Sequence, residues 1–77
     1  MENESMKLLR RAAAAAFLQE RGFPTSKQTL AKLACRGGGP PFRRFGRVPL
    51  YTPANLLTWA TGRLGRTATS TSQADRA

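Results

Sequence analysis

Residues 37–53, with the sequence GGGPPFRRFGRVPLYTP, decide the fold of this chain. The opening glycines are free in φ and the prolines that follow are fixed, so a preceding helix must end and the chain leaves extended. Two short runs, 42–45 and 48–51, then flank a tip at Gly46-Arg47, which predicts a small hairpin. Pro49 has no N–H to donate to a ladder, so its strand should lie at an edge.

Helical patterns lie on both sides of this stretch. The first helix should span about 10–21, where an alanine-rich stretch precedes Gly22. The second should run from a Thr25 or Ser26 cap to about Cys35. Spacing predicts that the inward side chains are Ala13, Ala14, Phe17 and Leu18 in the first helix and Leu30, Leu33 and Ala34 in the second. The outward set of the second helix is Lys27, Gln28, Ala31 and Lys32.

A third helix should follow the hairpin. Thr52 can cap it, and Pro53 suits its first turn. Gly62 or Gly65 should end it. Its expected apolar face consists of Leu56, Leu57, Trp59 and Ala60, with Trp59 fixed in the core.

The predicted fold class is therefore mainly α with a small β-hairpin, in the order helix, turn, helix, hairpin, helix. This is the order of a winged helix-turn-helix. At 77 residues the chain holds one domain at most. We expect a flexible N-terminus over 1–6, the domain over 7–65 and a disordered tail over 66–77, where no large apolar residue remains.

Positive charge dominates the chain. There are 13 Lys and Arg against 4 Asp and Glu, for a net charge of +9, and no acidic residue lies between Arg21 and Ala74. In a domain whose charges are nearly all positive, the charges repel one another, which favours a polyanionic partner. Nucleic acid is the first candidate, an anionic membrane surface is the second, and simple solubility is the third.

Catalysis and metal binding are not expected. The chain has no His, and its single Cys35 should be a half-buried residue near a helix end, so neither a zinc site nor a Cys–His pair can form. The glycine run lacks the Gly-Lys-Ser/Thr ending of a phosphate-binding loop. No cofactor is expected. Residues 7–18 resemble a signal peptide only superficially. No apolar stretch is long enough to span a membrane. We therefore expect the protein in the cytoplasm, associated with the nucleoid.

The positions of the polar residues point to DNA. Ser26, Lys27 and Gln28 open the second helix, which in a helix-turn-helix points at base edges. A Gln can pair with adenine, and a Lys can contact guanine or a phosphate. A hairpin tipped with arginine suits a minor groove, where the potential is most negative. The hairpin arginines are Arg43, Arg44 and Arg47.

The run from Ala13 to about Leu64 resembles the excisionase and MerR-like family of small winged helix-turn-helix proteins. The resemblance lies in AAFL (15–18), SKQTL (26–30), GGGPPF (37–42), RRFGR (43–47), LY (50–51) and LLTWA (56–60), over about two-thirds of the chain. It implies a recognition helix in the major groove and a wing on the adjacent minor groove. It places helix contacts at Ser26, Lys27, Gln28 and Lys32 and wing contacts at Arg43, Arg44 and Arg47. The chain departs from the pattern at Asn55, where an acidic residue is common, and at Arg47-Val48-Pro49, where a second basic residue often follows.

Family members are often excisionases, also called recombination directionality factors, which bind and bend attachment-site DNA so that an integrase excises a mobile element. The resemblance therefore predicts such a protein, with a site-specific recombinase as partner. The alternative is a transcriptional regulator of mobile-element or integrase genes, and a third hypothesis is a basic adaptor for an acidic protein. A single module this small covers few bases, which gives little sequence specificity, and several copies on adjacent sites would increase it. We therefore expect cooperative self-association on DNA.

Overall fold

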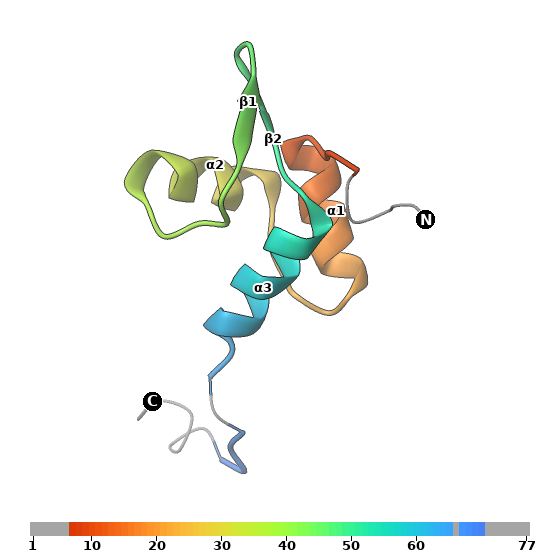
Figure 1. Ribbon diagram of the computed structural model, residues 1–77. Helices are drawn as coiled ribbons and strands as arrows, with labels where there is room; N and C mark the ends of the chain where they lie inside the picture. The colour runs from red at the N-terminus through yellow and green to blue at the C-terminus, as the bar shows by residue number, and fades with distance from the viewer. Residues whose placement is uncertain (1–6, 66, 71–77) are drawn as a thin grey trace.

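The order of elements follows directly from the helix and turn signals of the sequence. The computed structural model describes residues 7–65 and 67–70. Two helices are followed by a hairpin that projects away from them, and a third helix runs toward the opposite end of the molecule (Figure 1). The elements are α1 (Arg11–Glu20), α2 (Lys27–Arg36), β1 (Arg43–Phe45), β2 (Val48–Leu50) and α3 (Pro53–Arg63).

Helix α1 is built largely from alanine, the residue with the highest helix propensity. It ends at Glu20, and Gly22 follows with a φ of +89°. Its buried residues include Ala14 and Ala15, whereas Ala13, which spacing placed inward, is exposed. The prediction failed there because five consecutive alanines look alike, and because α1 contacts both α2 and α3 and so buries two adjacent sides.

Helix α2 begins at a side-chain cap. The Ser26 hydroxyl accepts a hydrogen bond from the Thr29 N–H at 3.0 Å, which satisfies one of the free donors of the first turn. Leu30 is fully buried, as predicted. The remaining inward residues, Leu33 and Ala34, are only half-buried.

Two other predictions for α2 are wrong. Ala31 was expected outside and is half-buried, and Cys35 was expected to be half-buried and is exposed. Helix α2 packs against α1, and Leu30 is its buried residue, so its neighbour Ala31 is partly covered. Cys35 lies five positions beyond Leu30, where the helix surface has turned toward solvent.

The hairpin has the register that its turn dictates. Strands β1 and β2 are antiparallel, with Arg43 opposite Leu50, Arg44 opposite Pro49 and Phe45 opposite Val48. Gly46 in the two-residue tip has a φ of +68°, a conformation that a residue with a side chain rarely adopts. The predicted strands and tip are confirmed, except that each strand is one residue shorter at the end away from the tip.

Helix α3 begins as predicted and ends differently. The Thr52 hydroxyl accepts from the Asn55 N–H at 3.3 Å, and Pro53 occupies the first turn. The helix continues through Gly62 to Arg63, and Leu64 is already extended. Neither Gly62 nor Gly65 therefore ends it.

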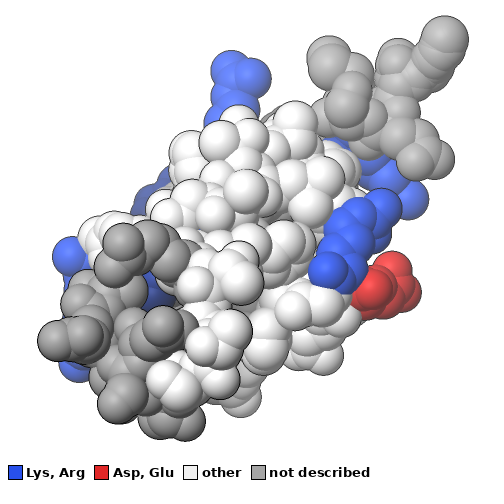
Figure 2. All heavy atoms as spheres, turned by 90° about the horizontal axis from the view of Figure 1, so that it is seen from below, with Lys and Arg blue, Asp and Glu red and all other residues white. Residues whose placement is uncertain are grey.

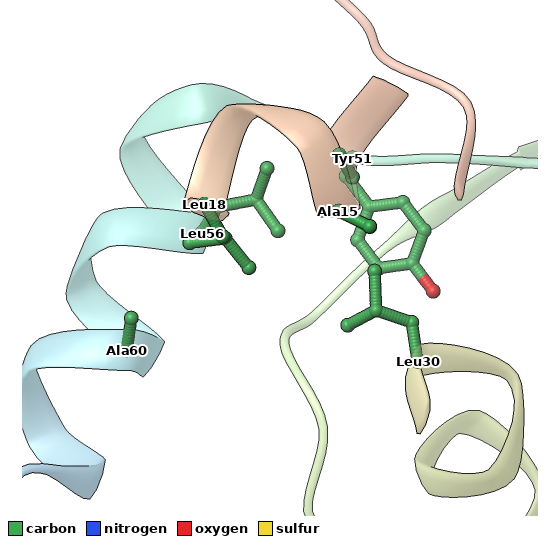
Figure 3. Close-up of a cluster of buried hydrophobic side chains, with 7 residues drawn as sticks. Ala15, Leu18, Leu30, Tyr51, Leu56 and Ala60 are labelled. Carbon is green, nitrogen blue, oxygen red and sulfur yellow. The ribbon is translucent and has the colours of Figure 1, made fainter. Parts of the chain in front are cut away.

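The core lies where the three helices meet the base of the hairpin. Side chains from α1, α2 and α3 turn toward one centre with Tyr51 (Figure 3). Leu18, Leu30 and Leu56 are fully buried, and Tyr51 is 1% exposed. The hairpin thus packs on the helices through an aromatic ring, as a two-stranded ribbon requires for stability.

Trp59 connects α3 to the glycine-rich loop. Its ring packs against the core, as predicted, but it is only half-buried and so lies at the edge of the core and not within it. Its Nε1–H donates to the carbonyl oxygen of Gly38 at 2.8 Å. Gly39 comes so close to α2 that a Cβ added there would lie 2.8 Å from the Leu33 Cβ.

The chain before α1 joins the hairpin. Leu9 and Tyr51 form an antiparallel bridge with two backbone hydrogen bonds of 2.7 Å. This bridge was not predicted, because a single paired residue leaves no strand pattern in the sequence. It fixes the start of α1 against the base of the hairpin.

Within the described residues, three helices and a two-stranded antiparallel hairpin in this order give a winged helix-turn-helix shape, which confirms the predicted fold class. The expected flexible segment 1–6 and most of the expected disordered tail, residue 66 and residues 71–77, lie outside the described residues. Residues 67–70 form neither helix nor strand. No helix within the described part of the chain is long and apolar enough to cross a membrane.

Candidate nucleic-acid interface

A basic hollow lies between the start of α1, the start of α2 and the hairpin. It has a volume of about 370 Å³. Three separate segments supply its four cationic side chains, Arg10 and Arg11 from the start of α1, Lys27 from the start of α2, and Arg47 from the hairpin tip. Ala12, Val48 and Pro49 complete the lining, which contains no acidic residue.

The electrostatics of the helix ends add to this charge. The N-terminus of a helix carries a partial positive charge and favours acidic side chains. Neither α1 nor α2 has an acidic residue in its first turn, and both have a cation there instead. Two positive helix ends and four side-chain cations therefore meet at one hollow. These positive charges repel one another, and a bound anion would relieve the repulsion.

Arg11 is held in place by the aromatic residues at the base of the hairpin. Its Nε–H donates to the Tyr51 hydroxyl at 3.0 Å, and its guanidinium carbon lies 5.8 Å from the Phe42 ring centroid. The two rings are themselves in contact, with centroids 5.5 Å apart. These contacts orient the guanidinium without neutralising it, so its charge stays available to a ligand.

The exposed face of α2 carries a polar stripe beside the hollow. Gln28, Lys32 and Arg36 are all exposed and follow one another at intervals of four residues, so they lie along one side of the helix. Ser26, which was also predicted to contact DNA, serves as the cap of α2. Its hydroxyl accepts from the Thr29 N–H and donates to the Thr29 hydroxyl at 2.9 Å.

The hairpin arginines are exposed but do not share one face. Successive residues of a strand point to opposite sides, so Arg43 and Arg44 diverge. Arg44 lies over the Phe42 ring, with its guanidinium carbon 5.9 Å from the centroid. Of the predicted wing residues, only Arg47 lines the hollow together with Lys27. Arg43 and Arg44 flank the hairpin on its two sides.

Charge is sparse at the end of the molecule opposite the hairpin. Seen from that end, uncharged side chains fill the centre of the surface, and Lys and Arg lie around its edge (Figure 2). Within residues 7–65 the sequence contains one acidic residue, Glu20, at the last position of α1, whereas the hollow is at the first turn of that helix. The single carboxylate therefore lies about 15 Å from the hollow along α1.

The sequence prediction omitted Arg10, Arg11 and Arg36. Arg10 and Arg11 lie at the start of the first helix, far in sequence from Lys27 and the hairpin, and only tertiary packing brings them beside Lys27. Two arginines at the start of a helix were a usable signal, because that position favours the opposite charge. Arg36 could have been found from its spacing to Gln28 and Lys32.

Neither the models of known protein families, nor curated proteins, nor solved structures give a match to this chain.

Proposed function

We propose that the chain binds double-stranded DNA, with α2 in the major groove and the hairpin on the adjacent minor groove. The observation that carries the proposal is the basic hollow, where Arg10, Arg11, Lys27 and Arg47 gather from three segments without an acidic residue among them. Phosphate oxygens are the ligands that such a group of cations and helix N-termini favours.

The size of α2 agrees with this role. Its 10 residues give a rod of about 15 Å, and the major groove of B-form DNA, about 12 Å wide, admits a helix. Gln28 lies near the helix N-terminus, the end that contacts base edges in this class of fold. We assign base contacts to Gln28 and Lys32, and phosphate contacts to the cations of the hollow and to Arg36.

The biological role that we propose is that of an excisionase, or recombination directionality factor. It rests on the family resemblance of the sequence, and the basic hollow supports only its DNA-binding part. In this role several copies bind side by side on attachment-site DNA in the cytoplasm, bend it, and so allow a site-specific recombinase to excise a mobile element. The protein acts without a cofactor or a catalytic centre of its own.

A gel-shift titration at two salt concentrations tests the proposal. The probe is a duplex that spans the attachment region of the element encoding the protein, with unrelated duplex as competitor. Stepwise, cooperative shifts that survive the competitor are expected from a multimeric excisionase. One non-cooperative shift would contradict multimeric assembly, and preferential binding to a promoter duplex would favour a transcriptional regulator.

The adaptor hypothesis makes the opposite prediction. A chain whose charge serves an acidic protein has little affinity for either duplex and is indifferent to Gln28→Ala. Weak binding that the competitor removes at both salt concentrations would therefore refute a sequence-specific DNA-binding role.

A further inference from the structure

Phe45 is a large apolar side chain at the tip of the hairpin with almost no protein around it. It is 78% exposed, the most of any large hydrophobic residue among those that the structure describes. Its cross-strand partner is Val48, and the turn at Gly46 and Arg47 follows it directly. The aromatic contacts of the hairpin with the core are made instead by Phe42 and Tyr51, at its other end.

The surroundings of Phe45 are cationic. Arg43 and Arg44 precede it and Arg47 follows it, and the whole hairpin lacks an acidic residue. Arg47 also lines the basic hollow with Lys27 of α2, so the tip belongs to the side of the molecule to which we assign DNA. A phenyl ring between arginines on a narrow projection complements a surface that is anionic outside and aromatic inside. The minor groove of duplex DNA is such a surface.

We propose that Phe45 is an apolar wedge that enters between two base pairs from the minor groove, unstacks them and kinks the duplex. Side chains such as Phe and Leu do this in proteins that bend DNA by about 20–90° from the minor groove. The inference rests on the proposed DNA binding and deepens it, because it assigns the bending to one side chain. The arginines beside it hold phosphates on either strand while the ring is inserted.

Charge favours DNA over a second copy of the chain as the occupant of this tip. Residues 21–74 carry only positive charges, so the tip of one copy is repelled by the cationic surfaces of another. DNA attracts the same arginines at every phosphate. A flexible pyrimidine–purine step is the cheapest to unstack and is the expected insertion point.

Fluorescence of 2-aminopurine tests the wedge, because this base brightens when it loses its stacking neighbours. The full chain first selects a bound duplex from a random-sequence pool. Single 2-aminopurines are then placed in turn at each purine of that duplex, and fluorescence is read with protein at saturation. We expect one step to brighten with the natural chain, little change there with Phe45→Ala, and a largely retained signal with Phe45→Leu, which keeps an apolar wedge.

Leu64→Ala is the matched control. Leu64 is also large, apolar and 63% exposed, but it follows α3, far along the chain from the hairpin, and we expect it to leave the fluorescence unchanged. Phe45→Ala should also weaken binding by about ten-fold, as expected for the loss of one aromatic contact to a base. Because Phe45 is exposed, the thermal midpoint of its variants should match that of the natural chain.

The outcomes separate this inference from the proposed function. If the natural chain selects no duplex, DNA binding itself is wrong. If it binds but no 2-aminopurine brightens, or if Phe45→Ala brightens the same step equally, DNA binding stands and the wedge is refuted. If Phe45→Ala reduces only the cooperativity between copies and leaves the step bright, the ring contacts a neighbouring protein and the wedge is again refuted.

Discussion

Replacing Arg47 by Gln should reduce the salt dependence of DNA binding by about one phosphate contact. Each phosphate neutralised contributes about −0.9 to the slope of log K against log salt. If each of the four cations of the hollow contacts one phosphate, together they should contribute about −3.6 to the slope, and Arg47→Gln should make the total slope less negative by about 0.9. The same relation gives roughly a five-fold loss of affinity at 0.15 M salt.

Arg63→Gln provides the comparison for this experiment. It lowers the net charge of +9 by the same single unit, but Arg63 lies at the end of α3 with its guanidinium carbon 5.1 Å from the Trp59 ring centroid. Fluorescence anisotropy at five or more salt concentrations gives both slopes. We expect the Arg63 variant to keep the slope of the natural chain. Equal changes in both variants would show that net charge governs binding and would refute the role of the hollow.

Substitutions at three other positions test the interface and its support. Gln28→Ala should lose about 1–3 kcal/mol of discrimination at one base position, measured by competition with singly substituted duplexes, and an unchanged preference would show that this residue does not contact a base. Ser26→Ala should lower the free energy of unfolding by about 1 kcal/mol in urea, since it removes the cap bond to the Thr29 N–H, and Ser26→Asp should restore it. Gly39→Ala should destabilise the fold by about 1–3 kcal/mol, because the added Cβ would lie 2.8 Å from the Leu33 Cβ. A thermal midpoint of unfolding equal to that of the natural chain would contradict this close packing.

Much of the fold could be predicted from local signals. The Gly-Gly-Gly-Pro-Pro break, the hairpin tip at Gly46 and the cap at Thr52 each act over a few residues, and the structure places the elements accordingly. Burial within α1 could not be predicted, because alanines have no size difference to mark the inward side. The outcome at Ala13 and Ala15 depended on how two other helices pack against α1.

The candidate interface was predicted less completely than the fold. Lys27 and Arg47 were chosen separately and do line one hollow. Arg10 and Arg11 join them where the Leu9–Tyr51 bridge holds the start of α1 beside the base of the hairpin. Such a bridge is a contact between two single residues far apart in the sequence, and sequence periodicity cannot predict it.

Tyr51 has a mechanical consequence for the DNA binding that we propose. Its backbone pairs with Leu9, its hydroxyl accepts from Arg11, and its ring contacts Phe42. These contacts join the hairpin to α1, and α1 packs against α2, so the three elements form one frame that sets the span between the hairpin and α2. A frame of fixed span works like a caliper. If the chain binds DNA as we propose, this frame selects a double helix whose neighbouring grooves match its span, and any remaining adjustment comes from the DNA.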